Sequence, residues 1–175
     1  MRSIEQYVKE HRPRCLASLP WTTDASSRNS ALDRIHFKLL ELEDGVDTQC
    51  RVFGYDLRRL NERRTGDGTF VSPLFLHRAR DPERTLILDT DVHGYHGELS
   101  SSAKLRGTGA PQLYSCRACS EDRFFVQVTL DYAPAVQDLW DEETDIAIQD
   151  YFTGFTLTGT CANCGHPASI VELDL

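Results

Sequence analysis

The sequence predicts an α+β fold dominated by β-strands, with an N-terminal lobe over residues 1–112 and a C-terminal antiparallel sheet over residues 113–175. Short runs of alternating or continuous apolar residues, typical of strands, recur along the chain. Two short segments with helical spacing of apolar residues interrupt them. A Ser- and Gly-rich segment at residues 98–112 indicates a boundary between the lobes, and one compact domain is the alternative.

Two short helices are expected in the N-terminal lobe. Ile4, Tyr7 and Val8 follow i, i+3, i+4 spacing, which predicts an opening helix that ends near Pro13. Residues 56–64 place two leucines on one side and arginines on the other, which predicts a second helix.

The strands of this lobe follow from alternation and turn residues. Residues 34–55 alternate on both sides of Asp44–Gly45, a favoured hairpin turn, so we predict a hairpin there. A helix that starts from the capping box at residues 30–33 is the alternative for its first half. Further strands are predicted at residues 70–77 and 85–88.

The C-terminal part predicts three strands. Residues 124–132 alternate cleanly between apolar and polar side chains, and residues 151–158 and 169–173 are the other two strands. Between the first two strands lies an acidic segment, residues 133–150, which we interpret as an insertion.

The charge distribution argues against a nucleic-acid partner. The net charge is −8, and residues 120–175 contain eleven acidic side chains but a single basic one, Arg123. Binding to a polynucleotide needs clustered positive charge that neutralises phosphates. Residues 51–84 contain eight arginines against five acids, so a nucleic-acid-associated protein with an arginine face is the alternative.

The amino-terminal residues and the apolar runs bear on localisation. The first fifteen residues contain no apolar run typical of a signal sequence. No stretch approaches the roughly 18 apolar residues that a membrane span needs. We therefore expect a cytoplasmic protein without a membrane partner.

Four of the six cysteines form two CxxC pairs, Cys116/Cys119 and Cys161/Cys164. Disulfide frameworks belong to short secreted chains that cannot build a core, and this chain is long enough to build one. Two residues between paired cysteines allow both sulfurs to reach one ion. The pattern therefore predicts one structural zinc ion with a closed four-sulfur shell, and ordinary thiols at the remaining cysteines.

The two pairs, each next to a predicted strand, resemble a zinc ribbon, in which two CxxC knuckles cap a three-stranded sheet. The resemblance covers residues 113–175 and names no family for the rest of the chain. Residues 120–160 separate the pairs, about twice the roughly 15–20 residues of compact sites. A redox dithiol is disfavoured, because Cys119 leads into a strand rather than a helix.

A second metal site is the best enzymatic hypothesis. His93 and His96 follow a predicted strand, with Asp91 and Glu98 beside them, and could centre a metal hydrolase. The alternative is a polar loop, since glycines loosen this segment and a metal site needs rigid ligands. The sequence contains no nucleophile–base pair, phosphate loop or cofactor fingerprint, so we expect a protein that is not an enzyme.

The acidic insertion carries the predicted partner-binding surface. An aromatic residue surrounded by charges is typical of protein interfaces. We therefore expect a zinc-stabilised, non-catalytic protein that binds a basic protein, and an immunity or antitoxin-type inhibitor fits this charge balance. The predicted partner-binding residues are Trp140, Asp141, Glu142, Glu143 and Asp145.

Overall fold

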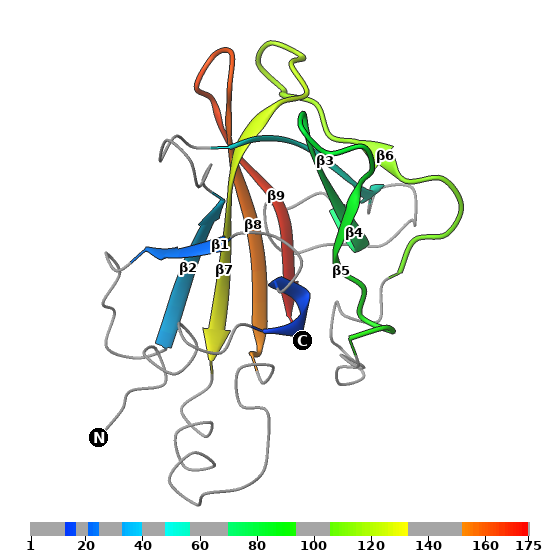
Figure 1. The fold of residues 1–175 in the computed structure, drawn as a ribbon, viewed down its shortest axis with the longest axis vertical. Coiled ribbons are helices and arrows are strands. Elements are labelled where there is room, and N and C mark those ends of the chain that lie inside the picture. Colours follow the sequence, from blue (N-terminus) through cyan, green and yellow to red (C-terminus); the bar gives the residue numbers. More distant parts are fainter. Residues whose placement is uncertain are drawn as a thin grey trace, which may run out of the picture.

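The residues that the structure describes form nine strands and one short 3-10 turn (Figure 1). The computed structural model describes residues 13–16, 21–24, 33–39, 48–56, 70–93, 106–132 and 152–174. The elements are η1 (Arg14–Leu16), β1 (Trp21–Asp24), β2 (Asp33–Leu39), β3 (Gln49–Asp56), β4 (Phe70–Arg78), β5 (Thr85–Leu88), β6 (Gln112–Leu113), β7 (Phe124–Tyr132), β8 (Gly154–Cys161) and β9 (Pro167–Asp174).

Five of these strands close into a barrel. The order around it is β3–β4–β9–β8–β7, and β7 returns to β3 through the pairs Gln49↔Phe125 and Cys50↔Phe124. Neighbours are antiparallel except β4 and β9, which run parallel where Phe70 faces Val171. Strands β1 and β2 extend the sheet from β7, β5 pairs with β4, and β6 pairs with β3.

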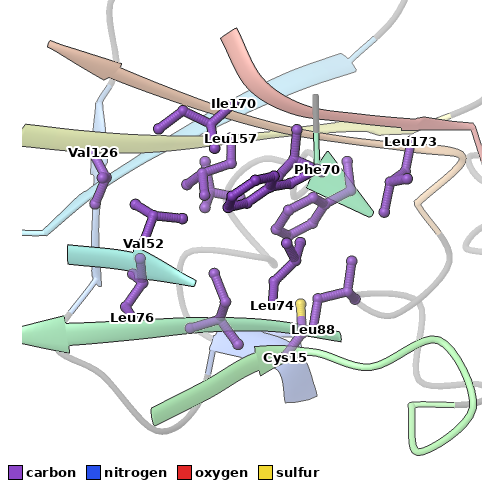
Figure 2. Packing of buried hydrophobic residues seen from close by; sticks show 14 of the residues in the cluster. Cys15, Val52, Phe70, Leu74, Leu76, Leu88, Val126, Leu157, Ile170 and Leu173 are labelled. Carbon is purple, nitrogen blue, oxygen red and sulfur yellow. The ribbon is translucent and has the colours of Figure 1, made fainter. Parts of the chain in front are cut away.

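The barrel interior is a single apolar core. Alternate residues of β7, from Phe124 to Tyr132, are buried, so one face of this strand lines the interior. Figure 2 shows Val52, Val126 and Leu157 pointing into the same space from three strands. Strands on both sides of residue 112 thus contribute to one core, which is the main stabilising feature of the fold.

The structure contradicts the predicted α+β class. The described residues contain strands and the single turn η1 but no α-helix, so the fold is all-β in the parts that can be seen. The predicted helix near residues 4–13 lies almost entirely outside those parts. Of the second predicted helix, residues 56–64, the first residue ends β3 and the others lie outside. In the same described ranges, no helix has the length and apolar character needed to cross a lipid bilayer.

The predicted strands are correct where the apolar pattern is contained within a few consecutive residues. Strands are confirmed at residues 70–77, 85–88 and 124–132, while β8 and β9 are longer or shifted relative to the prediction. The hairpin over residues 34–55 is wrong. Both of its strands exist, but β2 pairs with β1 and β7, whereas β3 pairs with β4, β6 and β7. Alternation defines the face that a strand buries and leaves its partner undetermined.

On β8, shortening a buried side chain should lower stability more than shortening a side chain of the outer face. Leu157 is fully buried, while its neighbour Thr156 is partly exposed. We expect Leu157→Ala to lower the free energy of unfolding by about 2–5 kcal/mol, because it leaves a cavity in the barrel. Thr156→Ala should cost less than about 1 kcal/mol. Urea denaturation of both variants measures the difference, and equal losses would contradict the assignment of the core face.

Candidate metal centre

Two short knuckles lie side by side at one end of the barrel. The first, residues 116–121, connects β6 to β7, and the second, residues 161–166, connects β8 to β9; both form loops at the top of Figure 1. The β7–β8 register pairs Phe124 with Cys161, and the Ala162 N–H donates to the Arg123 carbonyl at 2.9 Å. Strand pairing therefore brings the distant knuckles together.

The first knuckle is closed by backbone hydrogen bonds. The Cys116 N–H donates to the Glu121 carbonyl at 2.7 Å, and the Ser120 N–H donates to the Cys116 carbonyl at 2.8 Å. The Ala118 N–H lies 3.4 Å from the Cys116 sulfur and donates to it. Such an N–H stabilises negative charge on the sulfur, which a metal-bound thiolate requires.

The second knuckle repeats this pattern. The Cys161 N–H donates to the His166 carbonyl at 3.0 Å, and the Gly165 N–H donates to the Cys161 carbonyl at 2.9 Å. The residue after the second cysteine of each pair has a left-handed backbone, with φ of 65° at Ser120 and 73° at Gly165. The backbones of the two knuckles therefore make the same kind of turn.

The four predicted cysteines converge. Their Sγ atoms lie within 4.8 Å of one another. Two pairs across the knuckles are separated by 3.7 Å, between Cys116 and Cys164, and by 3.5 Å, between Cys119 and Cys161. A tetrahedral ion with bonds of about 2.3 Å would hold sulfurs about 3.8 Å apart. The four cysteines are therefore positioned to hold one metal ion.

The site is joined to the barrel core on one side and open to solvent on the other. Cys116 and Cys161 are buried members of the core cluster, whereas Cys119 is half-buried and Cys164 is exposed. Beneath them the Tyr114 ring packs edge-on against Phe124, with 5.4 Å between centroids. An ion here would fasten both knuckles to the core.

The electrostatics of the cluster favour a bound cation. The Asn163 side chain, followed by the backbone at Glu121, lowers the pKa of the Cys119 thiol to about 6. At Cys164 the backbone at His166 favours the thiolate, but partial desolvation of the sulfur and the three neighbouring sulfurs together raise the pKa to about 12. Four close sulfurs cannot all become thiolates without a positive charge among them, and a divalent ion would supply it.

The arrangement of the four cysteines suits a structural metal ion rather than a catalytic one. Four cysteines complete a tetrahedral shell, whereas a catalytic site keeps a position open for water. His166, which follows the second pair of cysteines, contributes its backbone carbonyl to the second knuckle. Cys15 and Cys50 are buried in the barrel core rather than in this cluster.

Sequence reasoning missed the residues around the ligands. Asn163 lies between the second pair of cysteines, and its polarity was the available signal for a role beside the thiolates. Glu121 was also missed by sequence reasoning. Its carboxylate pairs with the Arg123 guanidinium at 3.1 Å, and its backbone carbonyl closes the first knuckle.

The histidine segment is only partly described. Asp91 and His93 are seen, while His96 and Glu98 lie outside the described residues. The His93 Nδ1 accepts a hydrogen bond from the Asp89 N–H at 3.1 Å. Within the ranges that the structure covers, potential ligands from three or more residues converge at the four cysteines and at no other place.

Asp89, next to these residues, has a structural role. Its carboxylate pairs with the Arg106 guanidinium at 2.6 Å and accepts hydrogen bonds from the Asp91 and Val92 N–H groups. Although burial opposes it, these hydrogen bonds hold the pKa of Asp89 below its usual range. The predicted partner-binding residues 140–145 lie outside the described residues.

Comparison with known proteins returns no relative of this chain. No family model, curated protein or solved structure matches it. The geometry and chemistry of the residues themselves therefore carry the functional argument.

The two left-handed positions allow a paired test of the knuckles. The position of a Cβ at Gly165 has open space around it, so Gly165→Ala adds backbone strain alone, about 1–2 kcal/mol. Ser120→Gly should relieve strain of this kind in the first knuckle. We expect metal affinity to fall about 5–30-fold in the first variant and to stay level or rise in the second. Competition with a chromophoric chelator measures both, and equal weakening would contradict the proposed geometry.

Proposed function

We propose that one zinc ion, held by the four cysteines, stabilises a non-catalytic protein that binds a basic protein partner. The observation that carries the proposal is the convergence of the four Sγ atoms at distances suited to a tetrahedral ion. Thiolate ligands select zinc or iron among common metals, and a closed four-sulfur shell suits zinc in a structural role. The resemblance to a zinc ribbon supports the same choice.

The role of the ion follows from its position. It would join the loop before β7 to the turn between β8 and β9, so three strands of the barrel would be fixed at the same end. Structural zinc binding contributes its free energy to folding, because the unfolded chain holds no preformed site. The zinc would therefore stabilise the barrel as a whole.

Metal content tests this first part of the proposal. The purified protein should contain about one zinc per chain by elemental analysis and should lack the visible absorption of an iron–sulfur site. Cys116→Ser and Cys161→Ser should each lose the ion and lower the melting temperature by more than about 10 °C.

Cys50→Ala is the matched control for the metal. This cysteine is buried in the core outside the four-sulfur cluster, so its loss should lower stability modestly and leave zinc content unchanged. A zinc-free Cys116→Ser variant with unaltered melting would show that the ion does not stabilise the fold.

The partner surface is proposed on residues 133–150, the acidic segment around Trp140. The strands that flank it support this assignment. Tyr132 ends β7 and Phe152 precedes β8, and their rings pack edge-on with 6.2 Å between centroids. The knuckles lie at the opposite ends of these strands, about 27 Å away for a strand of this length. The two residues that flank the segment therefore lie far from the four cysteines.

The chemistry of the segment selects the partner. Trp140 would supply buried apolar area, while Asp141, Glu142, Glu143 and Asp145 would attract a basic surface and speed its association at low salt. An immunity or antitoxin-type role, in which the acidic segment neutralises a basic toxin, fits this charge balance. The binding of such a partner should weaken as salt concentration rises.

A charge-reversal variant tests the partner surface. Trp140→Ala combined with Asp141→Lys should weaken binding of the basic partner at least about 100-fold, because an anchor is lost and a like charge is added. Affinity purification identifies the partner, and titration in low and high salt then gives the affinities.

Asp91→Lys, which makes the same charge change at a side chain that is 65% exposed on another part of the chain, should bind the partner normally. Zinc content and melting temperature should stay near the wild-type values in both variants. Loss of about 3 kcal/mol or more of stability in the Trp140 variant would instead place this side chain in the core.

A further inference from the structure

A pocket of about 580 Å³ lies on the face of β3 and β4 that is turned away from the barrel core, beside the turn that leads into β5. Its volume is within the range of small-molecule sites, about 300–1,000 Å³. These strands and the turn form the cyan and green part of the sheet in Figure 1. The pocket is lined by Phe53, Phe75, His77, Pro82, Glu83 and Arg84.

Two phenylalanine rings form the floor of this pocket. Phe53 and Phe75 are cross-strand partners in the β3–β4 register, and both are partly exposed. The Arg84 guanidinium lies over both rings, 4.8 Å from the Phe53 centroid and 5.7 Å from the Phe75 centroid. The pocket thus combines two aromatic rings with the long cationic side chain of Arg84, which lies over them.

The turn that carries Arg84 is held firmly. The Arg78 guanidinium makes two hydrogen bonds to the Asp81 carboxylate, at 2.6 and 2.9 Å. The His77 Nε2–H donates to the Asp81 carbonyl at 2.9 Å, and the Asp81 N–H donates to the Arg78 carbonyl at 3.0 Å. The wall of the pocket is therefore preorganised, which lowers the entropic cost of binding a ligand.

We propose that this pocket binds a small aromatic anion, and that a nucleoside monophosphate is the ligand that fits it. The base would stack on Phe53 and Phe75 in the place that the Arg84 guanidinium now occupies. The guanidinium would move to the phosphate, for which its planar donors are suited. Glu83 would accept hydrogen bonds from the ribose hydroxyls or an exocyclic amine.

The overall charge decides between a single nucleotide and a polynucleotide. A net charge of −8 opposes the approach of a chain of phosphates, which would need several cations to release its counterions. One phosphate requires one well-placed cation, and Arg84 supplies it. The pocket is independent of the four-cysteine site, so this inference does not depend on the proposed zinc.

Calorimetric titration with four probes tests the assignment: adenosine monophosphate, adenosine, inorganic phosphate and tryptophan. Adenosine monophosphate should bind the wild-type protein saturably, about tenfold more tightly than adenosine, because the charge-assisted contact adds to stacking. Arg84→Ala should remove this preference while it leaves adenosine binding equal or tighter, since the aromatic platform is uncovered. Phe75→Leu, which keeps an apolar side chain on the strand, should weaken both ligands about tenfold.

Arg117→Ala, at an exposed arginine outside the pocket, is the charge-matched control and should bind like the wild type. Circular dichroism and melting should show that each variant is folded. The proposal is overturned if adenosine monophosphate does not bind saturably, or if its affinity is unchanged in Arg84→Ala or Phe75→Leu. Tighter binding of tryptophan than of adenosine monophosphate would also overturn the nucleotide assignment.

Discussion

The backbone pairing of β7 is the interaction on which the other features of this structure depend. One edge of β7 pairs with β8 from Phe124 to Asp131. Its other edge is divided between β3, which closes the barrel at Phe124 and Phe125, and β2, which extends the sheet along residues 127–132. Because the buried side chains of β7 alternate over its whole length, a slip by one residue would expose all of them. Barrel closure, core and knuckle placement therefore share one register.

The parts of the fold that the sequence predicts are those that depend on neighbouring residues. Residues 124–132 and 85–88 were predicted with the correct bounds, because alternation or an apolar run is visible within a few residues. The expected hairpin of residues 34–55 failed since its strands pair across long stretches of chain. The parallel pair of β4 and β9, at Phe70 and Val171, has no local signal at all. Such pairings are decided by how the core closes.

The candidate metal site was more predictable than the fold around it. A CxxC pair encodes half of a tetrahedral shell within four residues, so Cys116 and Cys161 could be assigned without knowing the topology. The long separation between the pairs had no consequence, since β7 and β8 bring their ends together. The pocket, in contrast, could not be predicted from the sequence, because its residues are far apart along the chain. Phe53, Phe75 and Arg84 come from three segments, and only the register of β3 and β4 places the two rings together.

The two ends of the β7–β8 pair have different physical tasks. At one end the four cysteines are positioned to hold a metal ion, which would fix the strands there. At the other end the Tyr132, Phe152 and Phe155 rings pack against one another, and the Thr153 N–H donates to the Asp131 carbonyl at 2.7 Å. Because both ends of the pair are held, the connection through residues 133–151 can be long at little cost, since loop-closure entropy grows only slowly with length. The register of the barrel therefore does not depend on the length or composition of this connection.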